Sequence, residues 1–188
     1  MRDPWCEMVR CGFGVVLASS IALISLVAKA QVVIVKDGRP QGRIYCANTN
    51  NLDAAREINY HLQKMSGAAL EIVTNAAAHD IRGPAIVLGD AAVALGAKAT
   101  KTSESKEGYC LRVKGDRVLI GGEGDDAVLF GAYALLEKLG CDWVMPGEIG
   151  EIIPLHPTVT VPAIDEAAAP DFLSRGLWYR GYNPPRLP

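Results

Sequence analysis

Apolar and polar positions along the chain predict two amphipathic helices. In the first, apolar residues recur at spacings of three and four, at Leu52, Ala55, Ile58, Leu62 and Met65. This periodicity is typical of a helix with one buried face. Asn50 or Asn51 is expected to cap its start, with Asp53 in the first turn. Gly67 is expected to end it in a left-handed conformation.

The second predicted helix covers residues 125–139. Its expected buried face consists of Val128, Ala132, Leu135, Leu136 and Leu139. Asp125 and Asp126 stand in the first turn, where a carboxylate complements the positive end of the helix dipole. Gly140 is expected to end this helix.

Short apolar runs outside the helices predict strands. We expect them at residues 32–35, 43–47, 70–74, 85–88, 109–113, 117–120, 143–145, 151–153 and 158–161. Lys114-Gly115-Asp116 predicts a hairpin, residues 37–40 a turn, and residues 75–84 and 97–107 loops. This succession predicts an α+β fold, an α/β sandwich in which a mixed β-sheet of about five to seven strands has two main helices packed on it.

The first thirty residues have the pattern of an export signal. Arg2 and Arg10 flank a mixed region, residues 12–27 are almost uninterruptedly apolar, and Ala28-Lys29-Ala30 provides small residues at a cleavage site. We expect a signal peptide over residues 1–30 that is cleaved after Ala30. The mature chain would then begin at Gln31 and be exported, either periplasmic or extracellular. An uncleaved membrane anchor is the alternative.

Charge and cysteine content narrow the class of protein. Removal of residues 1–30 takes away three basic and two acidic side chains, which leaves a formal net charge of −3. Because no basic run accompanies this charge, nucleic acid and an anionic membrane surface are not expected partners. The remaining Cys46, Cys110 and Cys141 do not form a disulfide framework, and we expect them to be buried. At most one pair could be oxidised after export.

One nucleotide-binding pattern is better explained as a turn. Residues 122–127 fit G-x-G-x-x-A between a strand and a helix, where glycines let the backbone approach a pyrophosphate. Asp125 and Asp126 would place negative charge at the phosphate position, so no cofactor is expected. The spacing of His61, His79 and His156 predicts no metal site. His61 is expected at the boundary of the apolar helix face.

Two pairs of carboxylates have the residue type that glycoside hydrolysis requires, an acid together with a base or nucleophile. They are Glu148 with Glu151, and Asp125 with Asp126. A Pro/Gly turn explains the first pair and a helix start explains the second. We therefore predict no catalytic residue in this chain.

Four aromatic residues near the end of the chain could form a surface on which a sugar ring stacks. They are Trp143, Trp178, Tyr179 and Tyr182. Trp143 is expected in the core, because it follows a predicted helix end. The other three would be exposed in this chain and form an apolar patch.

Seven short motifs occur in a fixed order between residues 31 and 182. They are LQKMSG (62–67), AIVLG (85–89), EGY (107–109), LIGG (119–122), FGAYALLE (130–137), GCDW (140–143) and PG (146–147). In this order they resemble the small α/β domain, β-hexosaminidase domain 2-like, that precedes the catalytic barrel of glycoside hydrolases. Family 67 α-glucuronidases and family 20 β-hexosaminidases are the relatives that the pattern resembles most.

The resemblance implies a division of the chain. Residues 31–162 would form the accessory domain, and residues 163–188 would form a linker and the start of a (β/α)8 barrel. The catalytic carboxylates would then lie beyond Pro188. The run Phe172-Leu173-Ser174-Arg175-Gly176 matches the strand on which family 20 enzymes carry a substrate-binding arginine, which implies that Arg175 binds sugar hydroxyls. Residues 177–180 depart from that family's continuation.

These implications give the expected function. The chain would be the accessory domain of an exported glycoside hydrolase that acts in carbohydrate breakdown, packed on its barrel and not catalytic by itself. A free-standing carbohydrate- or cell-wall-binding module is the main alternative, and a structural scaffold is the other.

Overall fold

A six-stranded mixed sheet is the centre of the fold. The computed structural model describes residues 31–46, 48–75 and 77–173. Across the sheet the strands follow the order β11-β6-β7-β5-β3-β4. Their bounds are Arg43–Cys46 for β3, Glu71–Thr74 for β4, Ala85–Leu88 for β5, Tyr109–Lys114 for β6, Arg117–Gly122 for β7 and Asp165–Ala168 for β11. Strands β3, β4, β5 and β7 are parallel, whereas β6 and β11 run antiparallel to their neighbours.

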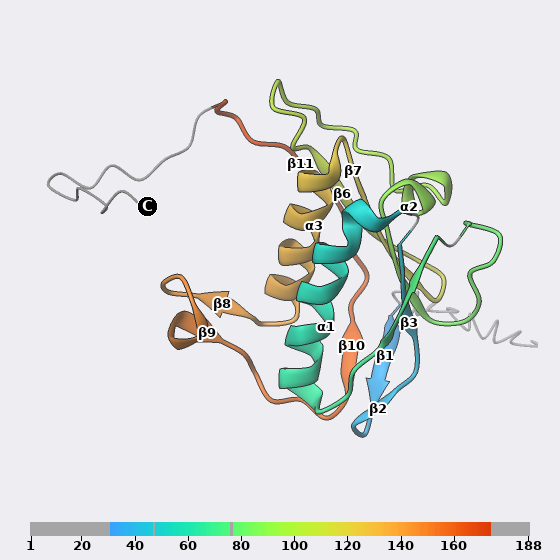
Figure 1. Cartoon of the computed structure of the whole chain (residues 1–188), viewed down its shortest axis with the longest axis vertical. Helices are drawn as coiled ribbons and strands as arrows, with labels where there is room; N and C mark the ends of the chain where they lie inside the picture. Colours follow the sequence, from blue (N-terminus) through green and yellow to red (C-terminus); the bar gives the residue numbers. More distant parts are fainter. Residues whose placement is uncertain (1–30, 47, 76, 174–188) are drawn as a thin grey trace, which may run out of the picture.

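Helices cover both faces of this sheet. The two long helices, α1 (Leu52–Ser66) and α3 (Asp125–Lys138), lie side by side on one face (Figure 1). Their apolar stripes bury Ile58, Leu62 and Leu135 against one set of alternating strand residues. The short helix α2 (Asp90–Ala94) packs on the other set of strand residues. The α+β prediction is confirmed, and so are the bounds of both long helices to within one residue.

Two small sheets complete the fold. One has the order β10-β1-β2, with β1 at Val32–Lys36, β2 at Arg39–Pro40 and β10 at Val159–Val161. The other pairs β8 (Asp142–Trp143) with β9 (Glu151–Ile152). Two 3₁₀ turns, η1 (Thr49–Asn51) and η2 (Glu148–Gly150), precede α1 and β9. In Figure 1, β8 and β9 project away from the rest of the fold beside the two long helices.

Two local predictions are wrong, and one short helix was not predicted. The linker expected to begin at residue 163 contains β11, which pairs with β6 over four residues from Asp165 to Ala168. Residues 39–40, expected in a turn, pair with β1 instead. Helix α2 was not expected, because five residues are too few to reveal a period.

The cap of α1 also differs from the prediction. Asn51 occupies the N-cap position of α1, but its side chain makes no capping hydrogen bond. Instead, the side-chain oxygen of Asn48 accepts from the Asn50 backbone N–H at 3.1 Å and caps η1. The amide groups of Asn50 and Asn51 donate to Asp125 at the start of α3, each at 3.0 Å. The starts of the two long helices are therefore tied together.

The cysteines lie in the interior as expected. Cys46, Cys110 and Cys141 are buried free thiols. The expected signal peptide lies outside the described residues. Within the described ranges, none of the helices has the length and apolar character needed to span a bilayer.

Candidate functional site

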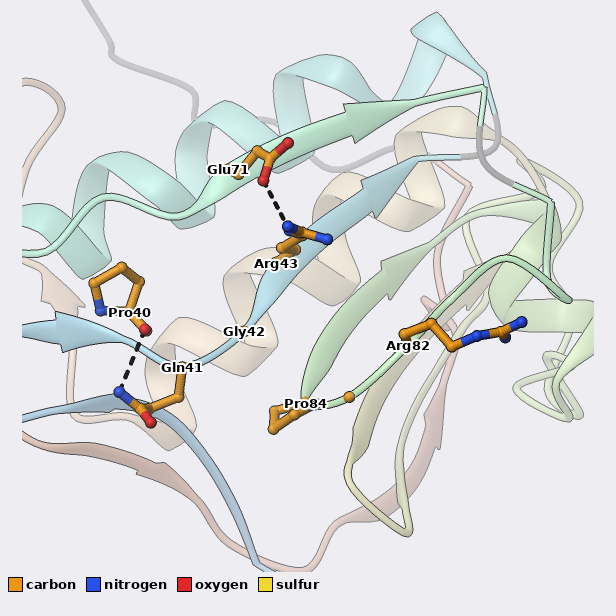
Figure 2. A pocket seen from close by; sticks show the side chains of 8 residues that line it. Pro40, Gln41, Gly42, Arg43, Glu71, Arg82 and Pro84 are labelled. Carbon is orange, nitrogen blue, oxygen red and sulfur yellow. Dashed lines mark hydrogen bonds and ion pairs between the residues drawn. The ribbon is translucent and has the colours of Figure 1, made fainter.

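A groove of about 430 Å³ opens at the amino-terminal ends of β3, β4 and β5 (Figure 2). It is lined by Pro40, Gln41, Gly42, Arg43, Glu71, Arg82, Gly83 and Pro84. The Arg43 Nε lies 2.7 Å from a Glu71 carboxylate oxygen, so the acid of this groove is already paired. In open parallel sheets, ligands bind at the carboxyl ends of the strands, whereas this groove lies at their amino-terminal ends. This groove therefore lacks both an unpaired acid and the usual position of a ligand site.

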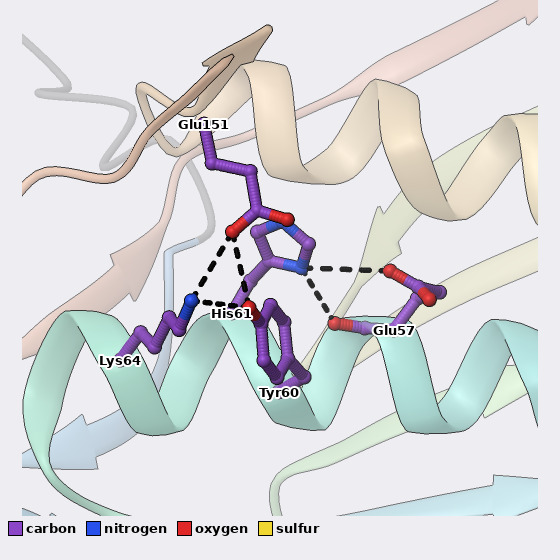
Figure 3. Close-up of polar contacts among 5 residues, drawn as sticks. All are labelled: Glu57, Tyr60, His61, Lys64 and Glu151. Carbon is purple, nitrogen blue, oxygen red and sulfur yellow. Dashed lines mark hydrogen bonds and ion pairs between the residues drawn. The ribbon is translucent and has the colours of Figure 1, made fainter. Parts of the chain in front are cut away.

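A cluster of polar side chains joins α1 to β9 (Figure 3). We call it the clamp, and it consists of Glu57, Tyr60, His61, Lys64 and Glu151. The first four lie on successive turns of α1, and Glu151 begins β9. Residues three and four apart share one side of a helix, so the α1 members reach the same neighbour.

The buried member of the clamp is His61, which is 1% exposed. Its Nδ1 lies 2.8 Å from the Glu57 backbone carbonyl oxygen, which can only accept, so Nδ1 carries the proton. The other ring nitrogen, Nε2, has no hydrogen-bond partner among the described residues. The imidazole lies edge-on to Tyr60 and Trp143, with ring centroids 5.0 and 5.3 Å away. Two aromatic rings thus pack against an imidazole that is almost fully buried.

Glu151 provides the clamp's contact from β9. One of its carboxylate oxygens accepts from the Tyr60 hydroxyl at 3.1 Å and from Lys64 Nζ at 3.2 Å. Lys64 also donates to the Tyr60 hydroxyl and lies 4.3 Å from that ring's centroid. Burial raises the pKa of the Glu151 carboxyl, but the hydrogen bonds from Lys64 and Tyr60 outweigh this and hold the pKa below its ordinary value. Glu151 is therefore an ionised carboxylate with one oxygen bound by two donors, rather than a poised acid.

The clamp fixes the position of residues 142–155, which we call the arm. Besides Glu151, the arm is held by the Trp143 ring, which packs edge-on to His61 and to Tyr133. Just past its end, the His156 N–H donates to the Met65 carbonyl at 2.8 Å. Large apolar side chains of the arm nevertheless remain exposed, namely Val144, Met145, Ile149, Ile152 and Leu155. Ile149 is 93% exposed and Leu155 80%.

This exposed apolar surface is unusual for a rigidly held segment. Monomeric proteins expose single apolar side chains freely, but five large ones within residues 144–155 are more than this and indicate an interaction surface. The clamp provides the rigidity, and the arm provides the surface. The arrangement suits the docking of another domain better than it suits chemistry.

The structure separates the carboxylates that the sequence placed together. Glu151 lies in the clamp, whereas Glu148 is exposed in η2. Asp125 is engaged by the Asn50 and Asn51 amides, and its neighbour Asp126 is exposed. Neither pair therefore forms an opposed acid and base. Across the described ranges, no group of three or more His, Cys, Asp or Glu side chains could hold a metal ion.

The remaining sequence candidates have different outcomes. Trp143 packs against the core, as expected. Arg175, Trp178, Tyr179 and Tyr182 lie outside the described residues, so the expected substrate contact of Arg175 stays a prediction. The boundary position expected for His61 is wrong, because this residue is buried.

Sequence reasoning also missed the clamp. The spacing of Glu57, His61 and Lys64 along one helix could have revealed its α1 side. Glu151 lies 90 positions after His61 along the chain, and no periodicity links the two.

Comparison with known proteins gives partial similarities of fold. No family model matches the chain, and no curated protein matches it. Among solved structures, the chain is similar to a family GH115 4-O-methyl-α-glucuronidase with specificity for decorated arabinogalactans, with 18% identity and a TM-score of 0.48 over 74% of this chain and 18% of that one. It is also similar to a GH138 enzyme targeting pectin rhamnogalacturonan II, with 18% identity and a TM-score of 0.37 over 53% of this chain and 13% of that one. The chain spans less than a fifth of the length of either enzyme, and at these values the similarity concerns part of the fold and says nothing of activity.

Proposed function

We propose that this chain is the accessory domain of an exported glycoside hydrolase, not catalytic by itself, whose arm docks on the catalytic barrel of the same protein. The observation that carries the proposal is the set of exposed apolar side chains on an arm that the clamp holds in place. The ordered sequence motifs indicate that a catalytic barrel is the domain on which the arm docks, because they resemble a domain that precedes such a barrel.

Two features of the described residues support a role without catalysis. Glu151 is neutralised by Lys64, and the Arg43–Glu71 pair takes up the acid of the groove in Figure 2. A glycosidase needs two carboxyl groups about 5–9.5 Å apart on either side of the scissile bond. We therefore expect no hydrolysis of nitrophenyl glucuronide or nitrophenyl N-acetylglucosaminide by the purified chain. Turnover of either substrate would refute this part of the proposal.

The docking role is tested in the protein that includes the barrel. The first step is to read the coding sequence beyond Pro188, where several hundred barrel-like residues are expected. In that protein, Ile149→Asp together with Leu155→Asp should lower the melting temperature and open the domain junction to proteolysis, because a fully buried Ile or Leu is worth about 1.5–3 kcal/mol. The same double substitution should leave the melting temperature of residues 1–188 alone nearly unchanged.

A matched control uses Val33, an exposed apolar residue of β1 that lies outside the arm. Val33→Asp introduces one such charge, half that of the double arm variant, and any loss that it causes should be equal with and without the barrel. If the arm variant also behaves identically in the two contexts, the arm is not a docking surface. Export belongs to the same proposal, and intact-mass analysis of the secreted protein should show loss of residues 1–30.

A further inference from the structure

A second groove, of about 340 Å³, lies between α3 and the β6–β11 side of the sheet. Phe130, Tyr133 and Glu137 of α3 stand three, four and seven residues apart, so they share one side of that helix. Tyr109 of β6 and Glu107 just before it line the groove from the sheet, and the small residues 168–170 line it at the end of β11. The groove exists because alanines, rather than large side chains, stand at this end of β11.

The tyrosine rings of this groove are held in place by their packing. Tyr109 is partly buried and packs against the hydrophobic core. Gly131 lets α3 lie close to the sheet at this point, since a Cβ at position 131 would be only 2.5 Å from Ile120 Cγ2 of β7. Tyr133 packs edge-on to Trp143 at a centroid distance of 5.2 Å. Phe130 is 38% exposed and contributes a partly solvated ring. Three aromatic rings thus gather in one concave surface, two of them fixed from behind.

The charges of the groove have one sign. Glu107 and Glu137 are among its lining residues, and none of the described lining residues is basic. Burial raises the pKa of the Tyr109 hydroxyl, and the Glu166 and Glu137 carboxylates raise it further while Lys138 opposes them. Lys138 itself is paired with Glu166 at 2.9 Å. A ligand in this groove therefore meets carboxylates, which accept hydrogen bonds and repel anions.

We propose that this groove binds an uncharged saccharide of one or two pyranose rings and rejects uronic acids. The C–H face of a pyranose suits an aromatic ring, whose face is negative, and its hydroxyls can donate to Glu107 and Glu137. The volume stands at the lower end of the range for small-molecule sites, about 300–1,000 Å³, which fits a short glycan segment. The inference rests on the carbohydrate-related function proposed above and adds to it a site for the neutral part of the polysaccharide.

The test is saturation-transfer NMR and calorimetry on the whole chain. The probes are xylotriose and galactobiose as neutral saccharides and glucuronic acid as the charged one, each at up to about 10 mM, a range that detects binding of about 3–4 kcal/mol. Saturable binding of at least one neutral probe and no binding of glucuronic acid are expected. Binding of neither neutral probe, or equal binding of glucuronic acid, would overturn the proposal.

Variants assign the binding to this groove. Phe130→Ala should weaken binding several-fold, since an aromatic contact is worth about 0.5–1.5 kcal/mol. Val144→Ala, at an exposed apolar residue of the arm, should leave it unchanged. Glu137→Gln keeps the shape of the side chain and removes its charge, so glucuronic acid should now bind detectably. Thermal melts of each variant check folding, and unaltered binding by folded Phe130→Ala would place the saccharide elsewhere.

The two proposals can fail separately. The arm variants Ile149→Asp and Leu155→Asp lie outside the groove and should not change saccharide binding. If the chain binds saccharide but the arm variants do not change the melting temperature of the protein that includes the barrel, the docking role is refuted and the groove proposal stands. If the arm variants lower that melting temperature but no neutral saccharide binds, the groove proposal alone is refuted.

Discussion

Alkaline pH should destabilise this protein through two buried thiols. Burial raises the pKa of Cys46 and that of Cys141 from 9.0 to about 11, and Glu151 adds to the effect at Cys141. The Cys46 thiol also donates a weak hydrogen bond to the Asn51 carbonyl oxygen at 3.9 Å, which a thiolate could not make. Both side chains are almost fully buried, at 0% and 4% exposure. The folded protein therefore favours the protonated thiol.

The sign and size of the effect follow from linkage. A thiol with a raised pKa in the folded state holds its proton after the unfolded chain has lost it, so stability falls as pH rises from about 9 to about 11. With pKa values of 9.0 unfolded and about 11 folded, each thiol lowers the free energy of unfolding at pH 10 by roughly 1 kcal/mol. Together the two thiols account for about 2–3 kcal/mol, a large part of a typical domain's stability.

Urea unfolding at pH 8 and pH 10, in the presence of a reductant, measures this loss. Tyrosines and lysines also titrate in this range, so the decisive quantity is the difference between the wild type and the double variant Cys46→Ala/Cys141→Ala. The double variant should lose about 2–3 kcal/mol less between the two pH values, whatever its stability at pH 8. Equal losses in both proteins would refute the reasoning.

Three further predictions concern the packing and the ties between elements. Asp125→Ala should lower the free energy of unfolding in urea by about 1–3 kcal/mol, because it leaves the buried Asn51 amide without its acceptor. Asp126→Ala should lower it by less than about 0.5 kcal/mol. Equal losses would contradict the stabilising role of the hydrogen bond between the starts of α1 and α3. Leu135→Ala should cost about 2–5 kcal/mol, and a smaller loss would mean that the core collapses around the cavity. Because the Glu151 pKa is depressed, its contribution is present at neutral pH and lost as pH falls below about 4.5. The wild type should therefore melt at a higher temperature than Glu151→Gln at pH 6, and the two melting temperatures should converge at pH 3.5. The same difference at both pH values would refute the electrostatic contribution of Glu151.

The parts of the fold that sequence predicts well are those with a strong period. The stripe that contains Ile58 and Leu62 defined α1, and the one that contains Leu135 defined α3, because each helix buries one face against a sheet. Lys114-Gly115-Asp116 was sufficient to predict the β6–β7 hairpin, since the turn depends only on residues that are adjacent in sequence.

The parts that could not be predicted depend on partners far away in sequence. Strand β11 has the sequence DEAA, which has little strand propensity. It forms because the edge of β6 offers backbone hydrogen bonds, and the Arg112–Asp165 pair, at 2.8 Å, supports it. The clamp likewise depends on α1 meeting the arm, and the groove of about 340 Å³ depends on α3 meeting β6 and β11. A single sequence gives the types of these residues but does not show which of them become neighbours in space.

Strand β11 also has a consequence for how the chain avoids aggregation. It covers the outer edge of β6, whose sequence YCLRVK combines apolar and β-branched residues. An uncovered strand of this kind offers its backbone groups to any other copy of the protein. The acidic residues Asp165 and Glu166 on β11 make the new edge a poor template for such pairing. A polypeptide cut at Pro162, where the sequence suggested a domain boundary, would keep both long helices and still be exposed to intermolecular strand pairing.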